Sequence, residues 1–450
     1  MLLHGAVALA LTLTPVTGSD RPVLDWGECP DNAAVQCADL RLPVDWSRSD
    51  GETFALAVAR RPAPDPAKRI GTLVFGPGGP GDSGVGKVLD GTRFSPEILD
   101  RFDVVSFDPR TVEGSAAPVC EPDPDLPRPP IVLRDQADFD TTVTWNRALW
   151  TRCRASSPVF DHASTLDTVR DIEALRRALG ESSLTFHGSS YGTLLGQQYA
   201  ERHPHRVRAV VLEGVFDHGL DLRGFVRTQA ASLQDAFEEF LAWCDATGQC
   251  GGDIRGEWAK LGDLERSVLP LMTLNGPDRP RLAALIRRYA AGQGPPITLP
   301  PIAAGAFCAD FPAPVRDYRE YASLLREAAH AGPDVRYGAG VAAISTCLGW
   351  PKPVTNPPHR LRVRTDIPLL LLNARHDPRT GLNWATRIAA ELGRHGRLVT
   401  YEGAGHGVYR DTPCTEAVVD RYLIDLAVPP PGATCPAPSA ASARSSSPSA

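Results

Sequence analysis

A serine with the surroundings of a nucleophile lies in the pentapeptide Gly188-Ser189-Ser190-Tyr191-Gly192. The residues before it, Leu184 to His187, have the apolar character of a buried strand, and Tyr191 to His203 carry apolar side chains at helical spacing. A sharp turn from strand to helix exposes the hydroxyl of its central serine, and only glycines let the neighbouring backbones pass so closely. The spacing therefore predicts that Ser190 is a catalytic nucleophile.

An acid and a histidine follow this serine in chain order, each just past a predicted strand. Asp377 lies in a turn after the apolar run Pro368 to Leu372. His406 lies in Gly403-Ala404-Gly405-His406-Gly407, after the run Leu398 to Tyr401. Parallel sheets place their sites at the ends of their strands, and the order serine, acid, histidine is typical of alpha/beta hydrolases. We therefore predict a triad of these residues.

The chemistry of acyl transfer requires these three residue types. Serine is a poor nucleophile until an imidazole takes its proton, and a carboxylate fixes the tautomer of the imidazole and stabilises the imidazolium. His376 is an alternative base, but it is adjacent to Asp377, and neighbours on a turn cannot easily face one another. His187 precedes the turn on the strand, and we interpret it as a packed, hydrogen-bonded residue.

A glycine-rich loop, Gly76-Pro77-Gly78-Gly79-Pro80-Gly81-Asp82-Ser83-Gly84, follows the apolar run Thr72 to Phe75. It lacks the Lys-Ser/Thr ending of a phosphate-binding P-loop and does not fit a dinucleotide-binding pattern. In a hydrolase such a loop supplies a main-chain amide to the oxyanion, and the residue after the nucleophile supplies a second one. The predicted donors are Gly78, Gly79 and Tyr191.

With these motifs the chain resembles the secreted tripeptidyl aminopeptidases, serine peptidases of the alpha/beta-hydrolase fold that are related to prolyl aminopeptidase. The resemblance covers roughly residues 25 to 430. The matching segments are Pro77 to Gly81, Phe107 to Arg110, Asp171 to Gly180, Gly188 to Thr193, Val211 to Val215, Asp377-Pro378 and Gly405 to Gly407. The resemblance implies an alpha/beta-hydrolase fold, a serine triad and the release of tripeptides from free N-termini.

The sequence departs from this family at three points. The usual Arg-Gly-x-Gly-x-Ser stands here as Arg110-Thr111-Val112-Glu113-Gly114-Ser115, so that two glycines are replaced by larger residues. Gly76 stands where the family has asparagine, and Asp82 stands where it has glycine. We expect these loops to border the active site, where an added carboxylate would change the choice of substrate.

The alternation of strand and helix patterns predicts an alpha/beta fold with a mostly parallel sheet covered by helices on both faces. The predicted strands lie at about 54–60, 71–75, 102–107, 183–187, 208–213, 367–373 and 397–402. The predicted domain ranges are a signal peptide at 1–22, the hydrolase core at 23–216 and 359–428, a helical cap inserted at 217–358, and a Pro-, Ala- and Ser-rich tail at 429–450.

The ends of the chain and its cysteines indicate secretion. Met1 to Leu13 is apolar and is followed by small residues, which is typical of a signal peptide, although His4 replaces the usual Lys or Arg. No apolar run elsewhere reaches the roughly 18 residues of a membrane span. An even count of ten cysteines beside such a leader favours disulfides over buried free thiols.

Short loops favour sequential pairing of these cysteines, although the sequence does not determine the connectivity. The expected pairs are Cys29 with Cys37, Cys120 with Cys153, Cys244 with Cys250, Cys308 with Cys347, and Cys414 with Cys435. The ligand spacings of a metal site are missing, and we expect neither a metal nor a cofactor. The formal net charge of −6 gives no reason to expect nucleic-acid binding.

These features predict a secreted serine exopeptidase that acts on peptides with a free N-terminus. Such an enzyme must bind the α-ammonium group, and Glu213, at the end of a predicted strand near the nucleophile, is the candidate for this role. An acid at that position could equally cap the next turn or face solvent. The alternative functions are a carboxylesterase with the same triad and a binding protein that has lost catalysis.

Overall fold

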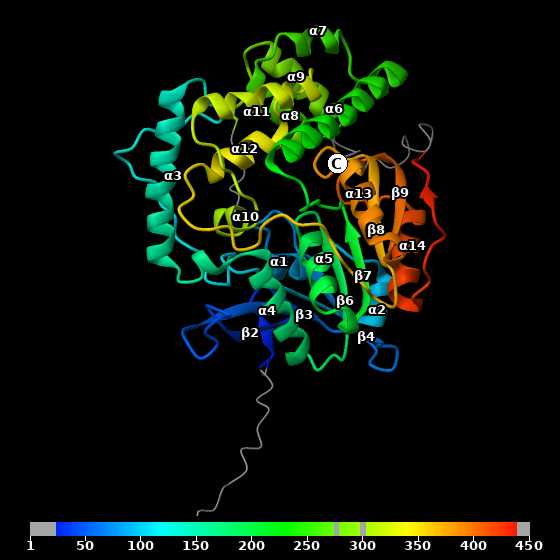
Figure 1. Ribbon diagram of the computed structural model, residues 1–450. Coiled ribbons are helices and arrows are strands. Elements are labelled where there is room, and N and C mark those ends of the chain that lie inside the picture. The colour runs from blue at the N-terminus through cyan, green and yellow to red at the C-terminus, as the bar shows by residue number, and fades with distance from the viewer. Residues whose placement is uncertain (1–23, 274–278, 298–302, 439–450) are drawn as a thin grey trace, which may run out of the picture.

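In the computed structural model, which describes residues 24–273, 279–297 and 303–438, a sheet of ten strands in the order β1-β2-β3-β5-β4-β6-β7-β8-β9-β10 forms the lower half of the molecule (Figure 1). β1, β2 and β3 are antiparallel, β3 is antiparallel to β5, and all further pairs are parallel. The strands are β1 Gly27–Cys29, β2 Asn32–Pro43, β3 Thr53–Arg61, β4 Gly71–Gly76, β5 Phe102–Phe107, β6 Leu184–Ser189, β7 Val207–Glu213, β8 Leu369–His376, β9 Gly396–Ala404 and β10 Thr434–Cys435.

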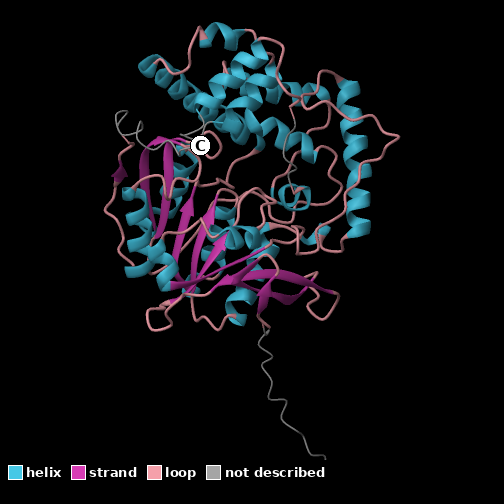
Figure 2. Ribbon diagram, turned by 180° about the vertical axis from the view of Figure 1, so that it is seen from behind, coloured by secondary structure: helices cyan, strands magenta, loops and turns pink. Residues whose placement is uncertain are grey.

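Helices cover both faces of this sheet, as the view from behind in Figure 2 also shows. One face packs on α4 (Thr165–Ala178), α5 (Gly192–Arg202) and α13 (Leu382–Leu392). The other face packs on α1 (Gly84–Asp90), α2 (Pro96–Arg101) and α14 (Pro413–Asp425). All positions of β4 and β5 are buried for this reason, because parallel strands between two helical layers have no solvent side. The predicted fold class is confirmed.

All seven predicted strands are present, within a few residues at their ends. β1 and β2 were missed because β1 has only three residues and β2 alternates polar and apolar residues weakly, although Pro30-Asp31 between them is a turn signal. β10 was also missed, because it lies in the range interpreted as the tail. Thr434 and Cys435 pair with Thr400 and Tyr401 of β9 at the edge of the sheet. The predicted signal peptide and the last residues of the tail lie outside the described residues.

A helical layer lies above the sheet in Figure 1, mostly from the chain between β7 and β8. Its helices in that segment are α6 Leu222–Thr247, α7 Ile254–Ala259, α8 Asp263–Thr273, α9 Arg279–Ala290, α10 Ala304–Asp310, α11 Tyr318–Ala331 and α12 Gly338–Cys347. An earlier helix, α3 (Gln136–Ser156), belongs to the same layer, because the Asn146 side chain donates to the carbonyls of Ser345 and Leu348 at 2.9 and 3.1 Å. The predicted cap range of 217–358 leaves this helix out.

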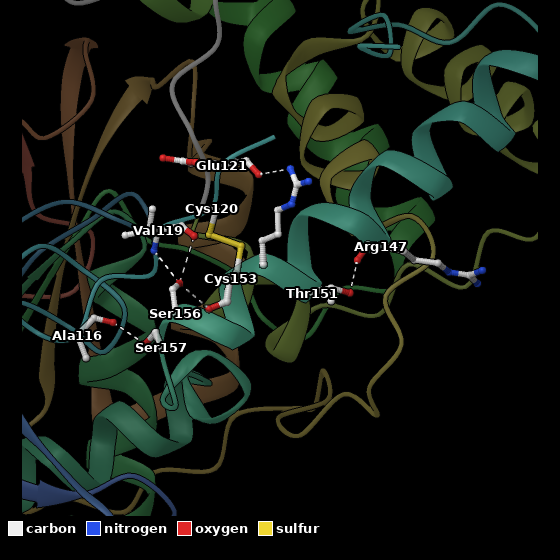
Figure 3. The surroundings of a disulfide bond; sticks show 10 residues. Ala116, Val119, Cys120, Glu121, Arg147, Thr151, Cys153, Ser156 and Ser157 are labelled. Carbon is white, nitrogen blue, oxygen red and sulfur yellow. Dashed lines mark hydrogen bonds between the residues drawn. A yellow bond between two sulfur atoms is a disulfide. The ribbon is translucent and has the colours of Figure 1, made fainter. Parts of the chain in front are cut away.

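The five predicted disulfides are all present. Figure 3 shows the bond between Cys120 and Cys153, which fastens the loop after β5 to the end of α3. Beside it, the Ser156 hydroxyl accepts from the amide of Val119 at 2.9 Å, and the Ser157 hydroxyl donates to the carbonyl of Ala116 at 2.6 Å. These contacts hold a long connection without secondary structure against the helical layer. Within the ranges given above, no helix has the length and apolar character to cross a membrane.

Candidate active site

Ser190 lies on a tight elbow between β6 and α5. Its φ of +56° lies in the left-handed region, and its amide donates to the carbonyl of Glu213 at 2.8 Å. The flanking glycines are required by space, because a Cβ on Gly188 would lie 2.4 Å from the carbonyl oxygen of Gly192. A Cβ on Gly192 would lie 2.2 Å from the carbonyl oxygen of Gly76. The backbone conformation is the one the pentapeptide predicts for an exposed nucleophile.

Asp377 and His406 face one another across the ends of β8 and β9. Nδ1 of His406 lies 3.0 and 3.1 Å from the two carboxylate oxygens, and the Asp377 side chain is buried. The amides of Arg379 and Thr380 donate to the same carboxylate at 2.8 and 2.9 Å. Because Asp377 accepts, Nδ1 must carry the hydrogen, and Nε2 is the nitrogen that can take a proton.

Thr380 is a member of this group that the sequence analysis missed. Its hydroxyl donates to Oδ2 of Asp377 at 3.0 Å, and the Thr380 hydroxyl oxygen itself lies 3.2 Å from Nδ1 of His406. The signal was present, since a threonine three residues after an aspartate on a turn commonly bonds to it. The hydroxyl therefore touches both members of the pair and restricts their mutual orientation.

The His406 ring packs against the main chain next to the nucleophile. Ser189 is paired with Glu213 in the β6–β7 register, and Gly214 follows with a φ of +63°. A Cβ on Gly214 would lie 3.1 Å from Cε1 of His406, so only glycine leaves room for the imidazole here. The structure thus brings the serine elbow and the histidine to adjacent main-chain segments.

The other two histidines considered above have different surroundings. Nδ1 of His376 lies 2.9 Å from the Asp235 carboxylate on α6, so this ring contacts the helical layer. His187 is fully buried, and burial together with the charge of Arg93 lowers its pKa well below the usual value. Its Nε2 lies 2.9 Å from the Glu213 carboxylate, which agrees with the interpretation as a packed and hydrogen-bonded residue.

The glycine-rich loop lies directly against the nucleophile. A Cβ on Gly78 would lie 3.1 Å from Cβ of Ser190, and a Cβ on Gly79 (φ +104°) would lie 2.5 Å from the amide nitrogen of Gly81. Tyr191 is buried, as expected for a residue that enters α5 at the elbow. The loop is therefore close enough to the serine for an oxyanion to lie between Gly78 or Gly79 and Tyr191.

Asp108 joins this loop to the segment in which the sequence departs from its relatives. Its buried carboxylate accepts from the Ser83 hydroxyl at 2.6 Å and from the amides of Val85 and Gly114 at 3.1 Å. The position of one loop thus depends on the other. A change in the second loop can reach the oxyanion loop through this carboxylate.

The second loop keeps a glycine-like backbone without glycines. Thr111 and Glu113 have φ values of +70° and +31°, which place both in the region that favours glycine. The Thr111 side chain is buried, and its hydroxyl has no hydrogen-bond partner among the described residues. Glu113, in the same loop, is exposed, and its expected effect on the choice of substrate stays a prediction.

Glu213 does not have the surroundings expected of an ammonium-binding residue. Its side chain is 0% exposed. Its carboxylate is ion-paired with Arg93, lies 2.9 Å from Nε2 of His187, and accepts from the amide of Tyr409 at 2.6 Å. A carboxylate enclosed by three donors offers no face to a substrate. The expected role in substrate binding is therefore wrong, because burial turned this acid inward.

The described residues contain no group of three His, Cys, Asp or Glu side chains that could hold a metal ion. The carboxylate–imidazole pair, the strained serine elbow and the glycine-rich loop, gathered at the strand ends of a parallel sheet, define a serine hydrolase of the alpha/beta-hydrolase type.

Comparison with known proteins identifies the family. The TAP-like protein family matches residues 334–435. The chain is 30% identical to "Serine protease Hip1" of Mycobacterium tuberculosis, over 89% of this chain and 87% of that protein. It is 29% identical to "Tripeptidyl aminopeptidase" of Streptomyces lividans over 54% of this chain and 49% of that one. It is also 27% identical to "Carboxylesterase B" of Mycobacterium tuberculosis, over 94% and 92% of the two chains. The chain belongs to the family of TAP-like serine peptidases with the alpha/beta-hydrolase fold.

Proposed function

We propose that this protein is a secreted exopeptidase that removes tripeptides from the free N-termini of peptides, with Ser190, His406 and Asp377 as its triad. The observation that carries the proposal is the contact between the Asp377 carboxylate and Nδ1 of His406, beside an elbow that holds Ser190 at a φ of +56°. The relatives named as a serine protease and a tripeptidyl aminopeptidase support peptide bonds as the substrate.

In the proposed mechanism His406 acts first as a base and then as an acid in each half-reaction. The Ser190 hydroxyl attacks the scissile carbonyl carbon while its proton passes to Nε2 of His406, and Asp377 stabilises the resulting imidazolium. The oxyanion accepts from the amides of Gly79 and Tyr191, with Gly78 as the alternative loop donor. His406 then protonates the departing amine, which leaves an acyl-enzyme. Water then attacks this ester while its proton passes to Nε2 of His406. As the intermediate collapses, His406 returns that proton to Oγ of Ser190, and the peptide acid and free serine are released.

Secretion is supported by the cysteines and by the start of the sequence. Five disulfides join all ten cysteines, and structural disulfides persist in oxidising compartments outside the cytosol. The apolar segment Met1 to Leu13 has the composition of a signal peptide. Expression with this segment, followed by N-terminal sequencing of protein from the medium, should show cleavage near residue 22. Retention of an uncleaved chain inside the cell would contradict secretion.

The substrate test compares three compounds on the oxidised protein: a tripeptidyl arylamide, the same arylamide with its amine acetylated, and a short-chain aryl ester. We expect cleavage of the free-amine arylamide, loss of that cleavage on acetylation, and no cleavage by the Ser190→Ala variant. Cleavage of the ester alone, with no dependence on an amine, would instead establish a carboxylesterase. The likeness to "Carboxylesterase B" over nearly the whole chain makes this the second candidate.

His376, the alternative base, provides a matched control for His406. His406→Asn should reduce the turnover of the arylamide by about 10³-fold or more, because the serine loses its proton acceptor. His376→Asn should leave turnover within about two-fold, because His376 contacts Asp235 and not the serine elbow. The reverse result would assign the base to His376.

A further inference from the structure

We propose that Glu213 is a positioning residue for the reaction: it holds the loop that carries His406 at a set distance from the nucleophile elbow. This inference rests on the proposed roles of Ser190 and His406. Glu213 is buried and does not touch substrate, so it would act through these two residues alone.

Glu213 bonds to both segments at once. Its main-chain carbonyl accepts from the amide of Ser190 at 2.8 Å, and Oε1 of its side chain accepts from the amide of Tyr409 at 2.6 Å. Tyr409 is three residues after His406, on the loop that leaves β9. Glu213 therefore connects the segment of the nucleophile Ser190 to the loop of the base His406 by two short hydrogen bonds.

Two glycines lie at these contacts, Gly407 with a φ of +79° and Gly214 with a φ of +63°. A Cβ on Gly407 would lie 3.8 Å from Oε1 of Glu213, and a Cβ on Gly214 would lie 3.1 Å from Cε1 of His406. The histidine is therefore packed between the residue after Glu213 and a loop fastened to the Glu213 side chain. A shift of the carboxylate would move the imidazole relative to Ser190.

A half-buried arginine pairs with this carboxylate. Arg93 forms an ion pair with Glu213, and although burial lowers the pKa of Arg93 to about 10, the guanidinium is still charged at neutral pH. His187 contributes a neutral donor. Its Nε2 faces Glu213, while its Nδ1 has no hydrogen-bond partner among the described residues, which assigns the ring hydrogen to Nε2. The carboxylate thus accepts three bonds, one of which orients the catalytic loop.

The direct test is the variant Glu213→Gln, which keeps the shape but removes the charge and turns an amide NH₂ toward one of the donors. We expect kcat to fall by about 10- to 100-fold with KM within about two-fold, because the loop shifts while the substrate site does not. The rate at which a fluorophosphonate modifies Ser190 should fall by a similar factor. An unchanged kcat and labelling rate would overturn the proposal.

A second variant covers the case in which Glu213→Gln does not fold. Glu213→Asp keeps the charge and the partner Arg93, but it withdraws the oxygen from the Tyr409 amide by one methylene group. A folded Glu213→Asp protein with reduced kcat and unchanged KM supports the proposal, and wild-type kcat contradicts it. The Asp103→Asn variant is the structural control, because Asp103 is a buried carboxylate paired with Arg69 near the start of β5, at the opposite strand ends from the His406 loop. It should lower stability while kcat stays within about two-fold.

A double-mutant cycle separates positioning of the base from general loosening of the fold. In an Asp377→Asn background the His406 imidazole has already lost the partner that orients it. If Glu213 acts through His406, adding Glu213→Gln to this background should lower the labelling rate by less than about three-fold. If the double variant instead loses labelling rate by the product of the two single-variant factors, the proposal is overturned. The labelling rate needs no peptide, so it still tests Glu213 if the protein cleaves esters and the proposed peptidase function fails.

Discussion

The Tyr191 hydroxyl donates a hydrogen bond to the Asp310 carboxylate, which joins the residue after the nucleophile to helix α10 of the helical layer. Asp310 is fully buried, and it also accepts from the amide of Thr165 at 3.0 Å and from the Asn356 side chain at 2.8 Å. Burial raises the pKa of Asp310, so its ionised form depends on these donors. One carboxylate thus holds the oxyanion residue, the start of α4 and the return from the helical layer together.

Removing one of these donors should weaken the junction measurably. Tyr191→Phe leaves the buried Asp310 with one partner fewer, and we expect a loss of about 1 to 2 kcal/mol in the free energy of unfolding, measured by urea denaturation with the disulfides intact. The variant should also lower kcat, because the Tyr191 amide is a proposed oxyanion donor. Tyr321→Phe, which removes a hydroxyl that lies 3.3 Å from Oγ of Ser345 in the helical layer, is the control and should keep kcat. Equal kinetics in both variants would contradict the coupling.

The Thr380 hydroxyl should contribute to turnover and not to binding. Thr380→Val keeps the shape of the side chain but removes the contacts to Asp377 and His406, so we expect kcat to fall by about ten-fold with little change in KM. Thr380→Ser retains the hydroxyl and should recover most of the loss. Steady-state kinetics on the arylamide measure kcat and KM of both variants. If Thr380→Val is as active as Thr380→Ser, the hydroxyl has no role in turnover.

The strained loop beside the oxyanion segment should be stabilised by restoring glycine. Thr111 has a φ of +70° and a buried hydroxyl that finds no hydrogen-bond partner in the described part of the chain. Thr111→Gly removes both the strain and the unpaired hydroxyl, and it should raise the free energy of unfolding by about 1 kcal/mol. Thr92→Gly is the control. Thr92 is outside the left-handed region and its hydroxyl bonds to Asp90, so this change should destabilise. A lower melting temperature for Thr111→Gly would show that the loop is not strained.

Asp217 should make stability depend on pH. Its side chain is 0% exposed, and burial raises its pKa to about 6, against the attraction of Arg387 at 3.2 Å. Because the folded pKa is higher than the unfolded one, the contribution is greatest below about pH 4 and is lost as the pH rises through about 6. The difference in unfolding free energy between wild type and Asp217→Asn should therefore fall by about 2 to 3 kcal/mol from pH 4 to pH 7. A difference that does not vary with pH would contradict the raised pKa.

Local pattern was sufficient for much of the fold and for the members of the candidate triad. Parallel strands buried on both faces appear as apolar runs, and a nucleophile elbow needs glycines at set offsets, so Ser190, Asp377 and His406 could be selected from their immediate neighbours. The five disulfides agree with the sequential pairing that short loops favour, although the sequence alone left the connectivity open. The missed edge strands β1 and β10 are too short to show a period.

Only the tertiary structure decided which way the polar side chains face. The sequence alone put an acid at the end of β7, but burial beside Arg93 turned Glu213 inward, away from any substrate. Likewise, α3 joins the helical layer through Asn146, and Asp310 meets Tyr191 across more than a hundred residues of chain. The spacing of residues along the chain reflects local propensity. The partner of a buried charge is determined by the desolvation cost of leaving that charge unpaired. This cost depends on residues that are far away in the sequence.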